Sequence, residues 1–311
     1  MTDGNQHDVW SAGRSYDHYM GRWSRAVASL FVTWLDQPGD LDWVDVGCGT
    51  GALSATVIAD VAPRSLVGID PSDGFVQHAR DAVPDTRARF AVATAEALPL
   101  EDKSVDVVTS GLAYNFVTDR PAALREFRRV ARPGATISFY VWDYPGGGIG
   151  FIDAFWTAAV SVDPKARALD EASRFPFCTA GTLRSEINDA GLRHVEVEPI
   201  AVATRFDDFE SFWYPFTLGA GPAPGYLISL DDDARNGLRQ RLRAVVGDGP
   251  IELPLAPGHS RLTAPDGHSR DGGIERLLRD VHGALYHPLP AAQQERFSGR
   301  LALGLDPLEG T

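Results

Sequence analysis

Short hydrophobic runs alternate with helical patterns along the first half of the chain. Leu53, Val57 and Val61, for example, repeat at the spacing of one helical face between two such runs. Strands separated by helices of about 10–15 residues favour right-handed crossovers, and therefore a parallel sheet with helices on both faces. The sequence thus predicts a doubly wound α/β fold. Its strands are expected at residues 41–46, 65–70, 88–93, 104–110 and 135–142, after a first helix at 23–35.

After Trp142 the regular alternation ends. We expect residues 143–230 to contain cap elements over a substrate site, within one domain that covers residues 1–253. The patterns in this part predict helices at 151–160, 165–174, 182–190 and 209–216, and one long strand at 193–206.

The composition changes again near the end of the chain. Residues 254–311 are rich in Gly, Pro, Ser and charged residues, which bury too little apolar area to offset the entropy of ordering. They are expected to form a peripheral, mostly irregular extension that ligand binding does not need. One helical stripe, from Ile274 to Leu285, would dock either on the body of the protein or on a second subunit, which leaves a homodimer open.

The charge balance bears on the class of partner. The 311 residues include 42 acidic and 29 basic side chains, which gives a formal net charge of −13. Nucleic-acid affinity comes largely from neutralised phosphates, so this balance argues against a nucleic-acid partner. The arginines between residues 125 and 132 are interpreted as a solvated helix face. A small molecule is the expected partner.

Cysteine content and hydropathy bear on location. Cys48 and Cys178 are too few for a disulfide framework and lack metal-ligand spacing, so no metal site is expected. The first residues show no apolar core of signal-peptide length. No stretch reaches the roughly 18 uninterrupted apolar residues of a spanning helix. These features predict a cytoplasmic protein without a membrane segment.

The first predicted strand runs into the glycine-rich sequence 45–51, DVGCGTG. Glycines permit a tight turn and leave room for a ligand against bare main chain, beside the positive end of the next helix. The second strand ends at Asp70, where a carboxylate can accept hydrogen bonds from both hydroxyls of a ribose. A helix N-cap is the alternative role for Asp70, because Pro71 and Ser72 follow it.

Two ligand classes fit this loop. Gly47, Gly49 and Ala52 also satisfy the dinucleotide pattern of nicotinamide-dependent oxidoreductases, which remain an alternative. Asp45 favours S-adenosylmethionine instead, because a carboxylate there would attract an ammonium group and would repel a pyrophosphate. The sequence 94–99 after the third strand could bind an adenine edge. Asp106, which opens the fourth strand after a short acidic loop, is a third feature that favours S-adenosylmethionine. A structural role is nevertheless the favoured interpretation of this side chain.

Four motifs in order then resemble a known family. The series DVGCGTG (45–51), GIDPS (68–72), AEALP (95–99) and SVDVV (104–108) is similar to that of class I methyltransferases, especially the branch of quinone-biosynthesis C-methyltransferases. The clear resemblance covers residues 16–142. It implies a mainly parallel, seven-stranded Rossmann-like sheet and S-adenosylmethionine as the methyl donor.

The resemblance also implies which residues bind the donor. Asp45 would reach the amino group, and Asp70 would hold the ribose. A solvated loop position is the alternative for Glu96, and Cys48 is interpreted as a small buried side chain. The remaining donor contacts would come from Gly47, Gly49 and Gly51 along the methionine and ribose, from Pro71 against the adenine, and from Ala95 and Glu96 at the adenine edge.

Two segments could shape the site for the methyl acceptor. Tyr19 and Arg22 belong to an N-terminal segment that resembles one closing over the donor in relatives, where aromatic rings exclude water and a guanidinium neutralises a carboxylate. Asn115, after the fourth strand, could orient an acceptor. Helix-start packing and an ordinary turn are the respective alternatives.

Three further residues are candidates for acceptor contact or for catalysis. Trp142 and Trp213 lie in segments beyond the strand ends and are candidates for contact with a hydrophobic or aromatic acceptor. For Trp213, in the helical pattern 209–216, core or lid packing is the favoured role. His18 is the one histidine considered as a general base. No catalytic residue is assigned, because transfer from a sulfonium needs a base only when the acceptor is not already nucleophilic.

The predicted function is transfer of a methyl group from S-adenosylmethionine to a small apolar or aromatic metabolite by in-line displacement. Methylation at oxygen, nitrogen, carbon or sulfur remains open. A protein that binds S-adenosylmethionine without catalysis is a second alternative.

Overall fold

A computed structural model describes residues 20–200, 202–219, 221–255 and 257–263 of the chain. Contacts divide the chain between Gly267 and His268, so every described residue lies in the first of two units. Within the described residues, no helix is both long enough and apolar enough to cross a membrane.

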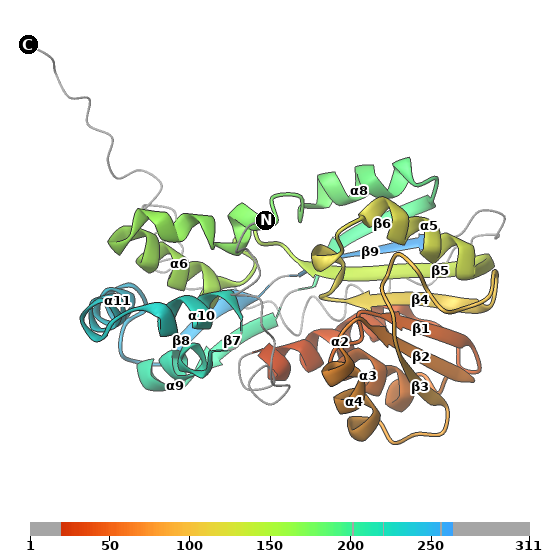
Figure 1. Ribbon diagram of the computed structural model, residues 1–311, viewed down its shortest axis with the longest axis horizontal. Coiled ribbons are helices and arrows are strands. Elements are labelled where there is room, and N and C mark those ends of the chain that lie inside the picture. Colours follow the sequence, from red (N-terminus) through yellow and green to blue (C-terminus); the bar gives the residue numbers. More distant parts are fainter. Residues whose placement is uncertain (1–19, 201, 220, 256, 264–311) are drawn as a thin grey trace, which may run out of the picture. The chain divides into compact units, whose positions relative to one another are not determined.

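Five parallel strands form the centre of the fold, in the order β3-β2-β1-β4-β5 (Figure 1). Strand β1 lies in the middle and pairs in parallel with both β2 and β4. Their near-continuous apolar sequences suit strands that helices cover on both faces. The bounds are Asp42–Val46 (β1), Ser65–Asp70 (β2), Ala88–Val92 (β3), Val105–Gly111 (β4) and Ala131–Trp142 (β5).

The main sheet has the expected seven strands, and five of them pair in parallel, so the sheet is mainly parallel with an antiparallel addition at one edge. Strand β9 (Pro257–Thr263) enters between β5 and β6 (Arg193–Pro199) and pairs antiparallel with both. The chain reaches β9 directly from strand β8 (Ile251–Leu255) of the cap, so β9 runs back along the sheet against the direction of β5.

Helices cover both faces of the sheet, as the sequence predicts. Buried residues of α2 (Arg22–Leu35) and α3 (Ala52–Asp60) pack on one face, where α4 (Asp73–Ala82) also lies. On the other face α5 (Arg120–Val130) and α8 (Ala180–Asp189) pack against β4 and β5. Figure 1 shows α2, α3 and α4 beside β1, β2 and β3 in the lower part of the picture, and α5 and α8 near β5 and β6 in the upper part.

Two insertions form a cap at one end of the sheet (left in Figure 1). Helix α11 of the second insertion packs on α6 of the first, which joins the two. The first insertion contains α6 (Gly150–Val162), η3 (Pro164–Ala168) and α7 (Glu171–Arg174). The second contains β7 (Val202–Phe206), α9 (Phe209–Trp213), η4 (Tyr214–Leu218), α10 (Pro222–Ser229), α11 (Asp232–Val246) and β8.

Two prolines divide elements that the sequence pattern predicts as continuous. The expected strand 193–206 is two strands, because β6 ends at Pro199 and β7 pairs with β8 in a separate sheet. The expected helix 209–216 changes from α9 to the 3₁₀ helix η4, which has Pro215 in its first turn. Proline has no N–H to donate, so it interrupts both ladders and helices.

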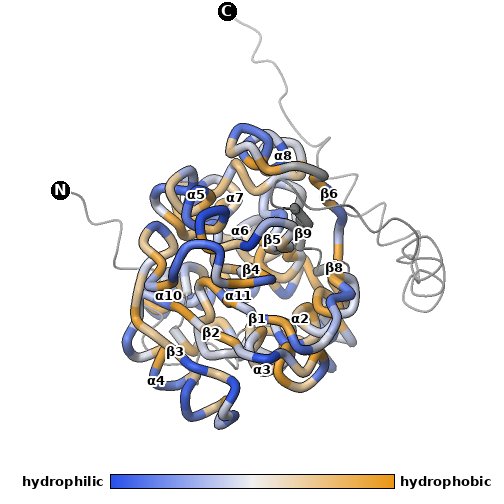
Figure 2. The backbone as a smooth tube through the Cα atoms, turned by 90° about the vertical axis from the view of Figure 1, so that its right-hand side faces the viewer, coloured by the Kyte–Doolittle hydropathy of each residue, from blue (hydrophilic) through white to orange (hydrophobic). Residues whose placement is uncertain are grey.

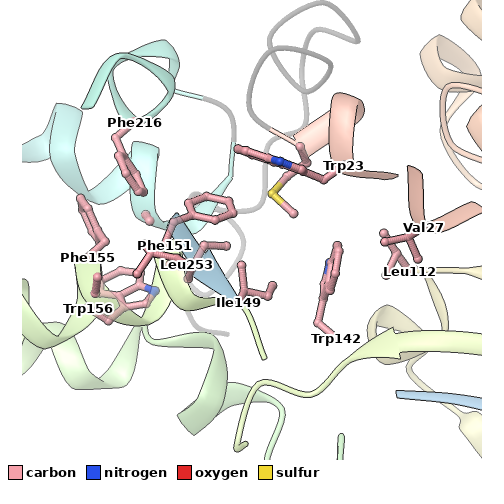
Figure 3. Packing of buried hydrophobic residues seen from close by; sticks show 14 of the residues in the cluster. Trp23, Val27, Leu112, Trp142, Ile149, Phe151, Phe155, Trp156, Phe216 and Leu253 are labelled. Atoms are coloured by element: carbon pink, nitrogen blue, oxygen red, sulfur yellow. The ribbon is translucent and has the colours of Figure 1, made fainter. Parts of the chain in front are cut away.

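Aromatic side chains pack the cap against α2. The ring of Trp23 lies 4.8 Å from that of Phe151, and Phe155 stacks on Phe216 at 4.7 Å. Figure 3 shows these rings with Trp156 in one cluster that extends toward Trp142. Figure 2 shows hydrophobic stretches along β4 and β5 and hydrophilic turns around helices such as α8.

Ion pairs tie the amino ends of the central strands. Arg132 contacts Asp42 at 3.0 Å and Asp106 at 2.8 Å, and Asp106 also accepts the backbone N–H of Asp42 at 2.9 Å. The structural role favoured for Asp106 is confirmed. Arg129 pairs with Glu126, so Arg129 and Arg132 are not the free solvated side chains that the pattern suggested.

Strand β9 lies beyond the domain boundary that the sequence places after residue 253. The composition of 257–263 gives little indication of a strand, yet this segment occupies an interior position of the main sheet. The rest of the expected extension, residues 264–311, lies outside the described residues, and its dispensability stays a prediction.

Two truncations test the revised boundary. A chain that ends at Leu253 loses the strand that joins β5 to β6, and we expect it to aggregate or to show no cooperative unfolding. A chain that ends at Gly267 keeps β9 and should unfold within a few degrees of the full-length protein. Thermal unfolding followed by circular dichroism measures both. A well-folded chain that ends at Leu253 would show that β9 is not required.

Candidate active site

A cavity of about 640 Å³ lies at the carboxyl ends of the parallel strands. It has the size typical of small-molecule sites. The ends of β1, β2 and β4 supply part of its wall, and cap residues such as Ile152 and Pro222 supply another part. Seven of the eight predicted donor residues line it: Asp45, Gly47, Gly49, Asp70, Pro71, Ala95 and Glu96.

The glycine-rich loop passes very close to the loop after β4. Gly47 has φ of +73°, and a Cβ atom there would lie 2.2 Å from the Cβ of Ala113. Only glycine therefore fits this position. Gly51 differs from the other two predicted glycines, because it is absent from the cavity wall. With φ of +89° it precedes α3, where a Cβ would press on Ala79 and Val83 at 3.3 Å.

Asp70 is held by the backbone at the end of β2. One carboxylate oxygen accepts the N–H of Gly49 at 3.0 Å, and the other accepts the N–H of Ser72 at 2.9 Å. Each oxygen keeps a lone pair for a further donor. Burial raises the pKa of Asp70, and these two hydrogen bonds oppose the rise. Ser72, not Asp70, is the N-cap of α4.

Asp45 is fully buried beside it, near the end of β1. Ser54 Oγ donates a hydrogen bond to Asp45 Oδ2 at 2.7 Å, whereas Oδ1 has no partner among the described residues. Burial raises the pKa of Asp45 to about 7, and the nearby Asp70 carboxylate adds to the rise. A buried carboxylate with a free oxygen is a site for a cation or a strong donor.

The part of the cavity wall that follows strands β2, β3 and β4 is less polar. Pro71, Phe75 and Ala95 line the cavity together with Phe116, which belongs to η2 (Tyr114–Phe116). Glu96 also lines it, but its Oε1 accepts the N–H of Asp119 at 3.3 Å, in the N-cap of α5. Phe75 and Phe116 carry no motif signal, so sequence analysis missed them.

The remaining wall is mostly apolar. Leu112 has φ of +58°, a strained conformation for a branched side chain, at the point where the chain leaves β4. Glu171 of α7 is the one charged side chain that the described part of the cap contributes to this wall. The wall consists of Met20, Ser24, Leu112, Tyr140, Tyr144, Ile152, Glu171 and Pro222.

The predicted acceptor residues do not gather in this wall. Asn115 is buried in η2, with neither amide atom paired among the described residues, and it is not among the cavity-lining side chains. Trp142 and Trp213 pack in the hydrophobic cluster and do not line the cavity. For Trp213 this is the packing role that the sequence favours. His18, Tyr19 and the side chain of Arg22 lie outside the described residues. From the N-terminal segment, Met20 and Ser24 reach the cavity.

Comparison with known proteins gives one domain match. Residues 44–139 match a family model described as "Methyltransferase domain". This range contains most of β1, all of β2 to β4 and most of β5, and it includes every donor residue that the motifs predict.

Curated relatives align over part of the chain. A malonyl-[acyl-carrier protein] O-methyltransferase of Geobacter sulfurreducens is 31% identical over 173 residues, which are 55% of this chain and 60% of that protein. A demethylmenaquinone methyltransferase of a Roseiflexus species is 37% identical over 95 residues, 30% of this chain and 40% of that protein. The chain thus spans less than two thirds of either relative.

A solved structure shows the same fold over a longer range. A proposed methyltransferase from an antibiotic biosynthesis pathway of Anabaena variabilis superposes with a TM-score of 0.56 at 20% identity, covering 76% of this chain and 96% of that one. With the motifs and the domain match, the family is clear for this part of the molecule: residues 44–139 are a class I methyltransferase domain of the S-adenosylmethionine-dependent kind, as the sequence predicted.

Proposed function

We propose that this chain transfers a methyl group from S-adenosylmethionine to a small apolar or aromatic metabolite. The observation that carries the proposal is the unpartnered Oδ1 of buried Asp45, beside the glycine-rich loop and Asp70. A ligand with an ammonium group and a ribose would satisfy both carboxylates. S-adenosylmethionine carries both groups.

The donor residues would act as follows. Asp45 pairs with the ammonium group, and Asp70 accepts hydrogen bonds from the ribose hydroxyls with its orientation already fixed by Gly49 and Ser72. Gly47 and Gly49 leave main chain exposed along the ligand. Pro71 and Phe75 offer apolar surface for the adenine, with Ala95 and Glu96 at its edge.

The bound donor supplies a methyl group on a positively charged sulfur, which is already activated toward nucleophiles. The protein then has to align the acceptor with that methyl group and exclude water. The apolar wall from Leu112, Ile152 and Pro222 suits exclusion of water.

The same carboxylate argues against a nicotinamide cofactor. A pyrophosphate next to Asp45 would place like charges together in a site of low dielectric. The described wall also contains Asp70, Glu96 and Glu171 but no Lys, Arg or His. Cationic and neutral ligands are therefore favoured over anionic ones.

The acceptor class rests on the cap side of the cavity. Met20, Leu112, Ile152 and Pro222 are apolar, and Tyr140 and Tyr144 add aromatic surface. The two curated relatives have different acceptors in their names, a malonyl-[acyl-carrier protein] and a demethylmenaquinone. Their alignments cover too little of those proteins to transfer either acceptor. The apolar wall supports a small hydrophobic or aromatic compound.

Ligand-dependent thermal stability tests the donor. S-adenosylhomocysteine at 100 times its dissociation constant should stabilise the protein by about 2.7 kcal/mol. NAD and NADP at the same concentration should leave the melting temperature unchanged. Stabilisation by NAD or NADP instead would support the oxidoreductase alternative.

Replacement of Asp70 by Ala should remove most donor binding. The loss of two hydrogen bonds to a carboxylate costs about 3 kcal/mol, which weakens affinity for S-adenosylhomocysteine about 100-fold. Isothermal titration calorimetry measures the change. Asp81→Asn is the matched control, because Asp81 is an exposed carboxylate on α4 that accepts a hydrogen bond from the side chain of Gln77. An unchanged affinity in Asp70→Ala would remove Asp70 from the site.

Donor affinity should depend on pH through Asp45. Its pKa is raised to about 7, so the free protein carries a neutral Asp45 below that pH and must release a proton to pair with an ammonium group. Affinity for S-adenosylhomocysteine should therefore rise with pH by up to tenfold per unit below about 7, and level off above it. Calorimetry between pH 5.5 and 8 follows this rise.

Asp45→Asn is the control for that titration. Asn keeps an oxygen that accepts from Ser54 but carries no charge at any pH. The variant should bind weakly, with an affinity that does not change across the same range. A pH-dependent rise that survives in Asp45→Asn would assign the titration to another group.

A further inference from the structure

Glu171 is a buried carboxyl that donor binding does not use. It is the first residue of α7, follows the N-cap Asp170, and is only 4% exposed. Its side chain lines the cavity on the cap side, together with Tyr144, Ile152 and Pro222. An ionisable group in such surroundings is costly unless it has a role or a strong partner.

The neighbours of Glu171 orient it without neutralising it. Trp156 Nε1 of α6 donates a short hydrogen bond to Glu171 Oε2, and the backbone N–H of Glu171 adds another. Trp156 is itself buried and packs between the rings of Phe155 and Tyr226. A carboxylate has about four acceptor positions, so these two donors leave capacity for a third.

Resting on the proposed methyl transfer, we propose that Glu171 is the catalytic base, which takes the proton from an oxygen or nitrogen of the acceptor as that atom is methylated. The substrate is then a small apolar or aromatic molecule with a hydroxyl or amino group. This assignment restricts methylation to an oxygen or nitrogen atom of the acceptor, a choice that neither the fold nor the family determines.

The proposed step balances as follows. The O–H or N–H bond of the acceptor breaks, and its proton moves to a carboxylate oxygen of Glu171. The heteroatom forms a bond to the methyl carbon, while the electron pair of the C–S bond goes to sulfur and converts the sulfonium to a thioether. Glu171 returns the proton to water when the products leave.

The electrostatics of the pocket suit this role. Burial raises the pKa of Glu171 to about 7, with Asp170 adding to the rise and Arg174 and Trp156 opposing it. A base with a pKa near the working pH combines an ionised resting state with useful basicity. Asp153 on α6 interacts with Asp170, and the negative charge of Asp170 raises the pKa of Asp153. These two residues therefore add acidic groups to this part of the cap. The cavity wall that the structure describes offers Asp45, Asp70 and Glu96 as its other charged groups, all at the donor end.

Glu171→Gln tests the proposal, because Gln keeps an oxygen for Trp156 but does not take the proton. Each protein is incubated with methyl-labelled S-adenosylmethionine and three separate probes, namely a set of phenols, a set of aromatic amines, and a small-molecule cell extract. Labelled product and S-adenosylhomocysteine are quantified. We expect kcat to fall at least 100-fold with the KM for donor unchanged. Glu101→Gln, at an exposed carboxyl, should behave as wild type.

The pH profile separates a base from a structural residue. S-adenosylmethionine is kept saturating at every pH, so that the titration of Asp45 does not contribute. Wild-type kcat/KM for the acceptor should then decrease as pH falls below about 7, and Glu171→Gln should lose this dependence. Trp156→Phe removes a donor that stabilises the carboxylate, so its acidic limb should move to higher pH while the ring still fills the core.

Three outcomes would overturn the proposal: wild-type rates in Glu171→Gln, a product methylated on carbon or sulfur, or no turnover of any probe by the wild-type protein. Binding of S-adenosylhomocysteine to Glu171→Gln, measured by calorimetry, keeps the two proposals distinct. If wild type and variant bind it equally, the donor site stands whatever the fate of Glu171. If wild type does not bind it, the proposed function itself fails.

Discussion

The parallel pairing of β1 with both β2 and β4 is the constraint on which the site depends. In-register pairing places Asp45 opposite Gly68 on one side and Thr109 on the other, so all three strands end at the same edge. The loop after β1 then has to pass the loop after β4 at a distance that admits only a glycine, Gly47 against Ala113. A side chain at Gly47 would separate the loops and open the edge of the sheet. The position of the glycine-rich loop is therefore a consequence of backbone packing at the middle of the sheet.

The same edge concentrates negative charge in a dry environment. Asp45 and Asp70 are both buried, and burial raises the pKa of each. Ser54 and two backbone N–H groups satisfy part of their hydrogen-bonding capacity but supply no positive charge. The free protein thus keeps an unfavourable arrangement that a cationic ligand would relieve. Local destabilisation of this kind is usual where a folded protein is organised around a ligand.

The sequence is sufficient to predict the parallel strands and to bring most of the residues proposed to bind the donor to one cavity wall. These residues stand at or just after the ends of strands whose hydrophobic runs are recognisable by themselves. Strand β9 is different. The segment 257–263 contains Pro257, Gly258 and His259, and pairing with β5 and β6, rather than its own composition, makes it a strand. Glu171 is likewise invisible to pattern analysis, because a Glu at a helix start normally faces water. Its burial depends on contact with Trp156, which lies 15 residues earlier in the sequence, on α6.

One part of the cavity wall is formed by main-chain turns and another part by side chains of the cap. This difference is consistent with the extent of the methyltransferase domain match. The matched range ends at residue 139, one residue before Tyr140, which is the first residue of β5 to line the cavity. The donor half is built from turns and main-chain groups, where a substitution disturbs the sheet itself. Part of the cap side of the cavity is built from side chains on α6, α7 and α10, which are inserted after β5. Helices α6 and α10 pack together through aromatic rings. Such side chains can change without moving the sheet, so the acceptor wall is free to differ between proteins that share the donor half.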